Sequence, residues 1–285
     1  MLKWLCAALA MVAFALNSLL NREALAGLHL DSWSFAFIRT FSGAVMLLIL
    51  DKVIPVKRSY NAVQASISWW GAIALSTYML GFSLAYVQLD AGIGALLLFS
   101  AVQFTMIAYA VFVAKERFSL WQWLMLAAAL GAFVALVRPS NGAIAISGAA
   151  MMVIAGVAWG VYSILGKGAE PRTATRIHFT RSALIMMPIA AVALLFFDDR
   201  VWTEKGFMLA VTSGAITSAL GYSLWYFVVA RIKTSQASIM QLSVPPIALV
   251  LGALLLQERL SQDTIFLCAI LLGAILAFTL LRYRQ

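Results

Sequence analysis

The stretch LGFSLAY at residues 80–86 decides the fold, because it returns as LGYSLWY at residues 220–226. Both copies read Leu-Gly-aromatic-Ser-Leu-x-Tyr, and they lie 140 positions apart in a chain of 285 residues. Two further pairs follow in the same order: ERFS at 116–119 with ERLS at 258–261, and LGAFVA at 130–135 with LGAILA at 272–277. Three ordered pairs at nearly constant spacing indicate an internal duplication.

The composition is that of a membrane protein. The chain is 64% apolar and 11% charged, with a mean hydropathy of +0.96, whereas a soluble domain carries roughly 25% charged residues. Continuous apolar runs of about 20 residues match the length that crosses a bilayer as a helix, and a β-barrel would show short alternating segments instead. We therefore expect an all-α integral membrane protein with ten transmembrane helices, at residues 3–20, 32–50, 67–88, 92–114, 119–137, 145–165, 175–197, 206–229, 234–256 and 263–281.

Five helices in each half make the halves inverted, because an odd number starts the second copy on the opposite side of the membrane. We expect a first five-helix repeat at 1–138 and a second at 143–285, joined by a hinge at 138–142. Inverted repeats are typical of secondary transporters, whose substrate site lies near the midplane between the halves.

The first apolar segment resembles a secretory signal peptide, because Lys3 precedes it and residues 24–26 resemble a small-residue cleavage site. However, it aligns with the start of the second half at a constant offset of 145. The matched positions are Phe14, Ser18 and Arg22 with Trp159, Ser163 and Lys167. We therefore expect it to be the first helix of the bundle.

The formal charge is +9, and the distribution of its Lys and Arg residues over the loops indicates how the chain is oriented in the membrane. With a cytoplasmic N-terminus, thirteen Lys and Arg fall in inner loops and five in outer loops, so both termini are expected inside, in a bacterial inner membrane. The basic residues are scattered over short loops, which speaks against a nucleic-acid partner. We expect lipid and a small-molecule substrate as partners, and a monomer, because ten helices can enclose a cavity within one chain.

The chain resembles the drug/metabolite transporter superfamily, in its EamA-type, ten-helix branch. The resemblance rests on AWGxxSxxxK at residues 158–167, on Arg39 repeated as Arg181, and on the Glu-Arg pair before the last helix of each half. It implies export of small metabolites, amino acids among them, through a central cavity. The first half departs from the pattern, since Phe14 and Arg22 replace the Trp and Lys.

No enzyme constellation stands out in the sequence, and we expect neither catalytic residues nor a metal or another cofactor. The two histidines lie in different halves, and no Ser-His-Asp order, HExxH or phosphate-binding glycine loop occurs. Cys6 and Cys268 have no metal-ligand spacing and are expected to be packing residues.

Polar and aromatic side chains deep in the segments are the candidates for a binding site, because polar groups in hydrocarbon usually face the bundle interior. An aromatic-lined cavity with few charges suits an amphiphilic or aromatic solute with a small polar head; the other interpretation of the aromatics is ordinary helix packing. The predicted substrate-binding residues are Asn17, Tyr78, Phe82, Phe99, Gln103, Trp159, Tyr162, Ser163, Tyr222, Gln241 and Ser243.

Arg39 and Arg181 place a positive charge inside the membrane at matching positions. Each either binds a substrate carboxylate or bridges neighbouring helices while reaching toward the interface. We favour the structural role, because an ordinary substrate does not need two copies of one contact. Pro245 and Pro246 have no counterpart in the first half and predict either a gating kink or a packing kink.

The acidic residues lie at segment ends, where they are poorly placed to carry a proton through the membrane; only His178 and Asp90 come close. We therefore expect a facilitator or exchanger that exports amino acids, with aromatic or hydrophobic ones favoured. Alternatives are an exchanger of phosphorylated metabolites or nucleotide sugars, a drug-type exporter and, more distantly, a membrane-embedded lipid enzyme or flippase.

Overall fold

The computed structural model describes residues 2–54, 68–89, 91–136, 146–196, 201–256 and 262–281. These residues are almost entirely helical, and their only extended pairing is an isolated bridge between Leu30 and Trp202. The helices of residues 2–136 are α1 (Leu2–Ala26), α2 (Ser32–Val53), α4 (Trp69–Tyr86), α5 (Ala91–Ala108) with the π-helix η1 (Tyr109–Val113), and α6 (Leu120–Leu136). Those of residues 146–281 are α7 (Ile146–Leu165), α8 (Pro171–Phe196), α9 (Glu204–Thr212), the π-helix η2 (Ser213–Leu220), α10 (Gly221–Val229), α11 (Thr234–Gln241), α12 (Val244–Leu256) and α13 (Gln262–Leu281).

Each predicted apolar segment coincides with helix, and polar side chains in the loops start several of the helices. Asp31 precedes α2 and its carboxylate accepts from the backbone N–H of Ser34 at 2.9 Å. Thr203 does the same for α9 through the N–H of Gly206 at 3.0 Å. Such caps satisfy donors that have no partner within the helix.

The predicted segment 234–256 is not one helix. It is interrupted at 242–243, where α11 ends and α12 begins with Val244, Pro245 and Pro246. A proline in the first turn of a helix costs little, because its missing N–H would have no partner there. The two prolines therefore start a new helix and do not bend a continuous one.

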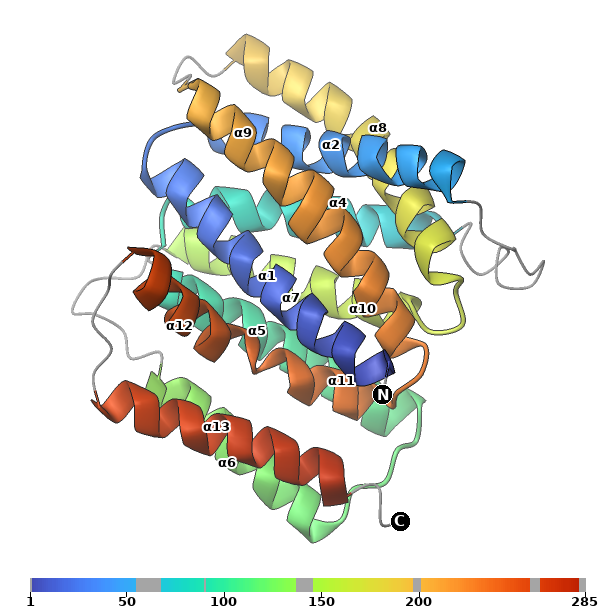
Figure 1. Ribbon diagram of the computed structural model, residues 1–285, viewed down its shortest axis with the longest axis vertical. Coiled ribbons are helices and arrows are strands. Elements are labelled where there is room, and N and C mark those ends of the chain that lie inside the picture. The colour runs from blue at the N-terminus through green and yellow to red at the C-terminus, as the bar shows by residue number, and fades with distance from the viewer. Residues whose placement is uncertain are drawn as a thin grey trace.

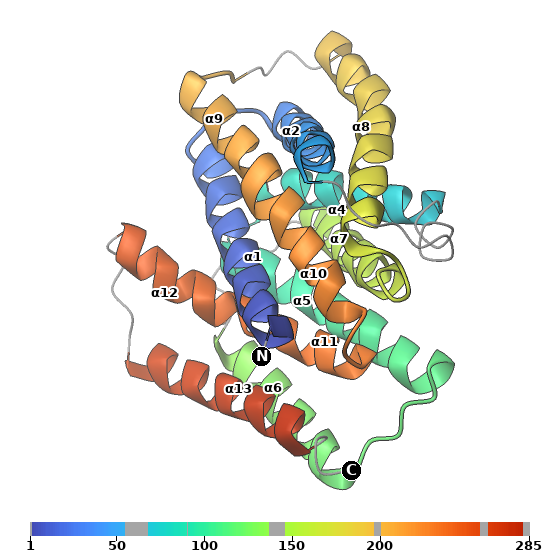
Figure 2. The same ribbon diagram turned by 45° about the vertical axis from the view of Figure 1, so that its right-hand side comes forward.

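The helices form a bundle in which α1, α4, α7 and α10 are central (Figures 1 and 2). Helices α2 and α8 pack together on one side of this centre, and α6 packs against α13 at the other end. Helix α7 lies against both α4 and α5, while α1 lies against α10 and α12.

Five helical runs of the described chain are long and apolar enough to cross a membrane: Leu2–Leu25, Ser32–Val53, Ile146–Leu165, Pro171–Phe196 and Glu204–Val229. These runs carry large apolar side chains that the protein leaves largely uncovered; Ile146, Leu195 and Phe196 are each at least 75% exposed. Exposed apolar surface of this extent suits contact with lipid. The architecture is that of a multi-pass helical membrane protein.

Candidate functional site

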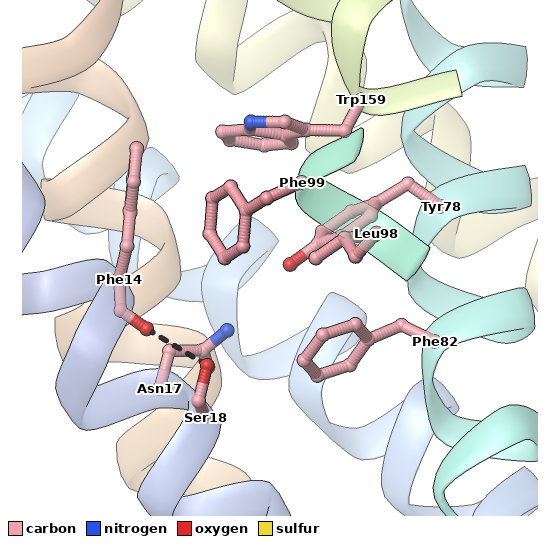
Figure 3. Close-up of a pocket in the computed structure, with 8 residues that line it drawn as sticks. All are labelled: Phe14, Asn17, Ser18, Tyr78, Phe82, Leu98, Phe99 and Trp159. Carbon is pink, nitrogen blue, oxygen red and sulfur yellow. Dashed lines mark hydrogen bonds between the residues drawn. The ribbon is translucent and has the colours of Figure 1, made fainter. Parts of the chain in front are cut away.

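A small cavity lies among the central helices, between α1, α4, α5 and α7. Its volume is about 20 Å³, little more than one water molecule needs. Aromatic rings make most of the wall, and two polar side chains of α1 complete it (Figure 3). The lining residues are Phe14, Asn17, Ser18, Tyr78, Phe82, Leu98, Phe99 and Trp159.

Five of these, Asn17, Tyr78, Phe82, Phe99 and Trp159, are among the predicted substrate-binding residues. The other three lining residues, Phe14, Ser18 and Leu98, are not among the predicted ones. The duplication could have identified Phe14 as a lining residue, because Phe14 aligns with Trp159. In the structure the two rings touch edge to face, with centroids 5.1 Å apart.

Trp159 is the centre of an aromatic cluster. Its ring centroid lies 4.8 Å from that of Tyr78, 4.7 Å from that of Tyr222 and 5.5 Å from that of Tyr162. Its indole N–H donates to the side-chain oxygen of Gln241 at 2.5 Å. Tyr162, Tyr222 and Gln241 thus lie behind Trp159 and support it, instead of lining the cavity themselves.

The polar floor of the cavity is held by the π-helix η2. The side-chain oxygen of Asn17 accepts hydrogen bonds from Ser213 at 2.5 Å and Thr217 at 3.1 Å. Figure 3 shows the amide nitrogen of Asn17 pointing toward the centre of the pocket. A π-helix widens the turn and is common at functional sites; here it turns both hydroxyls toward α1.

The remaining predicted residues lie farther from the cavity. Gln103 donates to the backbone oxygen of Ser238 at 2.6 Å and so ties α5 to α11. Ser163 accepts from the indole of Trp225 at 2.9 Å, within the packing of α7 on α10. Ser243 lies in the break between α11 and α12 and donates to the backbone of Met240 at 2.7 Å.

Arg39 is fully buried beside the cavity, about two turns after the start of α2. Its guanidinium donates to Ser218 at 3.0 Å, to Tyr222 at 2.6 Å and, over a longer 3.4 Å, to Tyr78. It also lies 5.5 Å from the ring centre of Tyr78 and 5.6 Å from that of Phe82. Two of the aromatic residues that wall the cavity are therefore in direct contact with a buried cation.

Arg181 does not repeat this environment. It is only partly buried, and its guanidinium lies 4.5 Å from the ring centre of Trp69, which is itself half exposed. The two arginines match in sequence but not in surroundings. Of the two, only Arg39 brings charge to the centre of the bundle.

Metal-ligating groups do not gather in the part of the chain that the structure describes, which holds no cluster of three or more His, Cys, Asp or Glu side chains. The buried ionisable side chains described there are Arg39, His178, Cys6 and tyrosines such as Tyr162; none is a carboxylate. The site can therefore bind through hydrogen-bond donors, aromatic faces and one positive charge.

The structure is a multi-pass helical bundle with a small aromatic cavity among its central helices. This arrangement is typical of membrane transport proteins, in which solutes bind between helices. The model of the EamA-like transporter family matches residues 146–280. An uncharacterized protein of Pseudomonas aeruginosa is 42% identical over 255 residues, covering 89% of this chain and 86% of that protein. The chain belongs to the EamA-like transporter family, within the drug/metabolite transporter superfamily, which confirms the resemblance.

Two further relatives carry the description of a transporter. The threonine/homoserine exporter RhtA of Salmonella typhimurium is 32% identical over 130 residues, 44% of this chain and 43% of that protein. An uncharacterized transporter of Archaeoglobus fulgidus is 25% identical over 199 residues, 68% and 70% of the two chains. A solved crystal structure with 16% identity covers 99% of both chains at a TM-score of 0.77, so the fold is one already seen by experiment.

Proposed function

We propose that this transporter exports small organic metabolites, amino acids first and aromatic or hydrophobic ones in particular, across the bacterial inner membrane. The observation that carries the proposal is the aromatic cavity at the meeting of residues from both halves, with Asn17 pointing its amide into it. Aromatic faces attract an ammonium group and also pack apolar side chains. The exporter RhtA, similar over part of its length, adds support for amino acids as the solute class.

The proposed machinery is a pair of inverted five-helix repeats, 1–138 and 143–285, with both termini in the cytoplasm. Helix packing supports it, because exchanging the halves maps one set of contacts onto the other. The contact of α4 with α7 has its counterpart in α10 with α1, and that of α5 with α7 in α12 with α1. The pairs α2 with α8 and α6 with α13 map onto themselves, as expected for helices that meet on a pseudo-twofold axis.

Alternating access requires a closure at each end of the bundle, and the halves touch at both ends of α2. At its start, the backbone N–H of Asp31 donates to the oxygen of Val201 at 3.0 Å, and Lys205 pairs with Glu23 at 2.5 Å. At its end, Asp51 pairs with Arg176 at 3.0 Å. Since the cavity between these closures holds little more than one water, the arrangement resembles an occluded state that a solute would open on either side.

A second inner contact joins the halves through Glu116. Its carboxylate accepts from the backbone N–H of Thr234 at 2.9 Å and from the hydroxyl of Ser235 at 2.5 Å, at the start of α11. A carboxylate at a helix N-terminus is stabilised by the free N–H groups and the helix dipole. This gives the Glu-Arg pair of the first half a role in holding the cytoplasmic side closed.

Transport is proposed to run down the solute gradient. A proton-driven exchanger usually carries its proton on a membrane-embedded carboxylate or histidine. The described residues include no buried carboxylate, and His178 alone is a buried group of this kind.

The test is release of labelled amino acids from preloaded proteoliposomes, with and without an imposed pH gradient. The proposal predicts release of phenylalanine, tryptophan or leucine at a rate that does not follow the pH gradient. Release that follows the gradient would refute the facilitator mechanism and direct attention to His178. Failure to release any amino acid, with release of a phosphorylated metabolite instead, would refute the solute class.

A further inference from the structure

Arg39 is a buried cation without a buried counter-ion in the described part of the chain. Its relative exposure is 0%, and the partners it has are three neutral hydroxyl groups. One of its terminal nitrogens, Nη1, is buried and has no hydrogen-bond partner among the described residues. Burying a charge without a partner of opposite sign is unfavourable, and ionisable residues inside membrane bundles are usually functional.

The sequence favours a structural role for the two arginines, because a substrate does not need two copies of one contact. The hydrogen bonds of Arg39 to Ser218, Tyr78 and Tyr222 do bridge helices, as that role requires. However, Arg181 lies against the half-exposed Trp69, while Arg39 is enclosed beside the cavity. The pair is a single central cation and a peripheral one.

Tyr78 connects the guanidinium to the cavity. Its ring lines the cavity, and Figure 3 shows its hydroxyl oxygen directed into the space between Phe99, Asn17 and Phe82. That oxygen accepts from Arg39 at 3.4 Å and from Tyr222 at 3.4 Å, both long for hydrogen bonds of this kind. Either hydroxyl of the Tyr78–Tyr222 pair can donate to the other, so the proton of Tyr78 has at most this one long contact among the described residues.

Two weakly satisfied donors therefore belong to one cluster beside the cavity: Nη1 of Arg39, which has no partner among the described residues, and the hydroxyl of Tyr78, whose hydrogen bonds are long. A carboxylate accepts such a pair of hydrogen bonds and supplies the missing negative charge. A neutral amide of the same size supplies neither the charge nor a second acceptor oxygen.

We propose that Arg39, with Tyr78, binds the carboxylate of the transported solute. This rests on the proposed function only in the identity of the solute as an amino acid. When the halves separate, a carboxylate enters beside Tyr78, takes the place of its long hydrogen bond to Arg39, and pairs with the guanidinium. The ammonium group then lies among the rings of Phe14 and Trp159, where cation–π attraction favours it.

The experiment measures binding to the purified full-length protein in detergent. The probes are L-phenylalanine, L-leucine and L-threonine, each paired with its carboxamide, together with 3-phenylpropionate, which has a carboxylate and no ammonium. Binding is read by isothermal titration and by the shift in thermal unfolding. The variants are Arg39→Gln, Arg39→Lys and, as the matched control, Arg181→Gln.

In the wild type, at least one acid should bind about 100-fold more tightly than its amide, the ratio expected when a charge-assisted pair of hydrogen bonds is lost. Arg39→Gln should reduce that ratio to below about threefold, Arg39→Lys should retain part of it, and Arg181→Gln should leave it unchanged. No preference for any acid over its amide in the wild type overturns the proposal, and this comparison does not depend on whether a variant folds. A preference that persists in a folded Arg39→Gln variant also overturns it.

Transport separates this inference from the proposed function. If 3-phenylpropionate binds in an Arg39-dependent manner while no amino acid is released from proteoliposomes, the carboxylate site stands and amino-acid export fails. If amino acids and their amides are released equally and Arg39→Gln changes nothing, export stands and the carboxylate site fails.

Discussion

Replacing Gly214 with alanine should destabilise the protein through the contact between η2 and α2. A methyl group at this position would lie 2.1 Å from the backbone oxygen of Arg39 and 2.0 Å from the hydroxyl of Ser42. Backbone atoms cannot turn aside, so α2 would have to move away from η2. Overpacking of this kind costs about 1–3 kcal/mol, which corresponds to a fall of about 2–10 °C in the unfolding temperature.

The same movement would weaken the site, because the close approach at Gly214 is what brings Arg39 within 3.0 Å of Ser218. We expect Gly214→Ala to lose affinity for the solute as well as stability. Adding Ser42→Ala removes the clash with the hydroxyl but not the clash with the backbone, so the double variant should recover only a minor part of the loss.

The control is Gly131→Ala in α6, where an added methyl group would meet no atom within 4 Å. Alanine is a better helix former than glycine by about 0.5–1 kcal/mol, so this variant should unfold at the same temperature as the wild type or slightly above it. Both variants and the wild type are compared by thermal unfolding in detergent. An unfolding temperature for Gly214→Ala equal to that of Gly131→Ala would refute the assigned packing of α2 on η2.

Three further predictions concern the closures and the cavity. Glu116→Gln keeps the side-chain volume but removes the charge at the start of α11, and should lower stability by about 1 kcal/mol in thermal unfolding; Glu116→Asp should lose less. Trp159→Phe keeps a ring in the cavity but removes the indole donor, so release assays should show a changed order of preferred solutes, and an unchanged order would contradict its place at the site. Asp51→Asn should open the inner closure and Glu23→Gln the outer one. The reporter is Phe99→Cys with the native cysteines replaced: an impermeant maleimide should react with it faster from the inner side in the first variant and from the outer side in the second. Equal rates from both sides would contradict the closures.

The positions of the helices could be predicted from the sequence because hydropathy is local. A run of about 20 apolar residues stays a helix in lipid whatever its neighbours are, since its backbone must satisfy its own hydrogen bonds. The break at 242–243 was harder to place, because a proline pair is compatible with a bend in one helix or with the start of a second. The helix found there begins at Val244, one residue before Pro245.

The candidate site could be predicted only in part, because burial depends on residues that are distant in sequence. Tyr78 and Trp159 were found from their depth in apolar segments. Whether a deep residue reaches the cavity or supports one that does depends on the rotation of each helix, and so Tyr222 lies behind Trp159 while Phe14 lines the wall. The π-helix η2, which turns Ser213 toward Asn17, leaves no pattern of hydrophobic residues that distinguishes it from an α-helix.

The divergence of Arg39 and Arg181 shows how a duplicated chain can acquire a single site. Arg39 is enclosed because Ser218 and Tyr222 of the second half meet it across 179 and 183 residues of sequence. The repeat places Tyr78 and Phe82 at the positions that match Ser218 and Tyr222. In the structure these two rings lie beside Arg39, while Arg181 lies against Trp69. Phe82 has no side-chain oxygen, so the position that matches Tyr222 cannot give Arg181 the 2.6 Å hydrogen bond that Tyr222 gives Arg39. The two repeated arginines thus differ because the helices around them carry different side chains, while the arginine itself is unchanged. A search for binding residues in a duplicated transporter should therefore compare the surroundings of repeated charged residues before it discounts them.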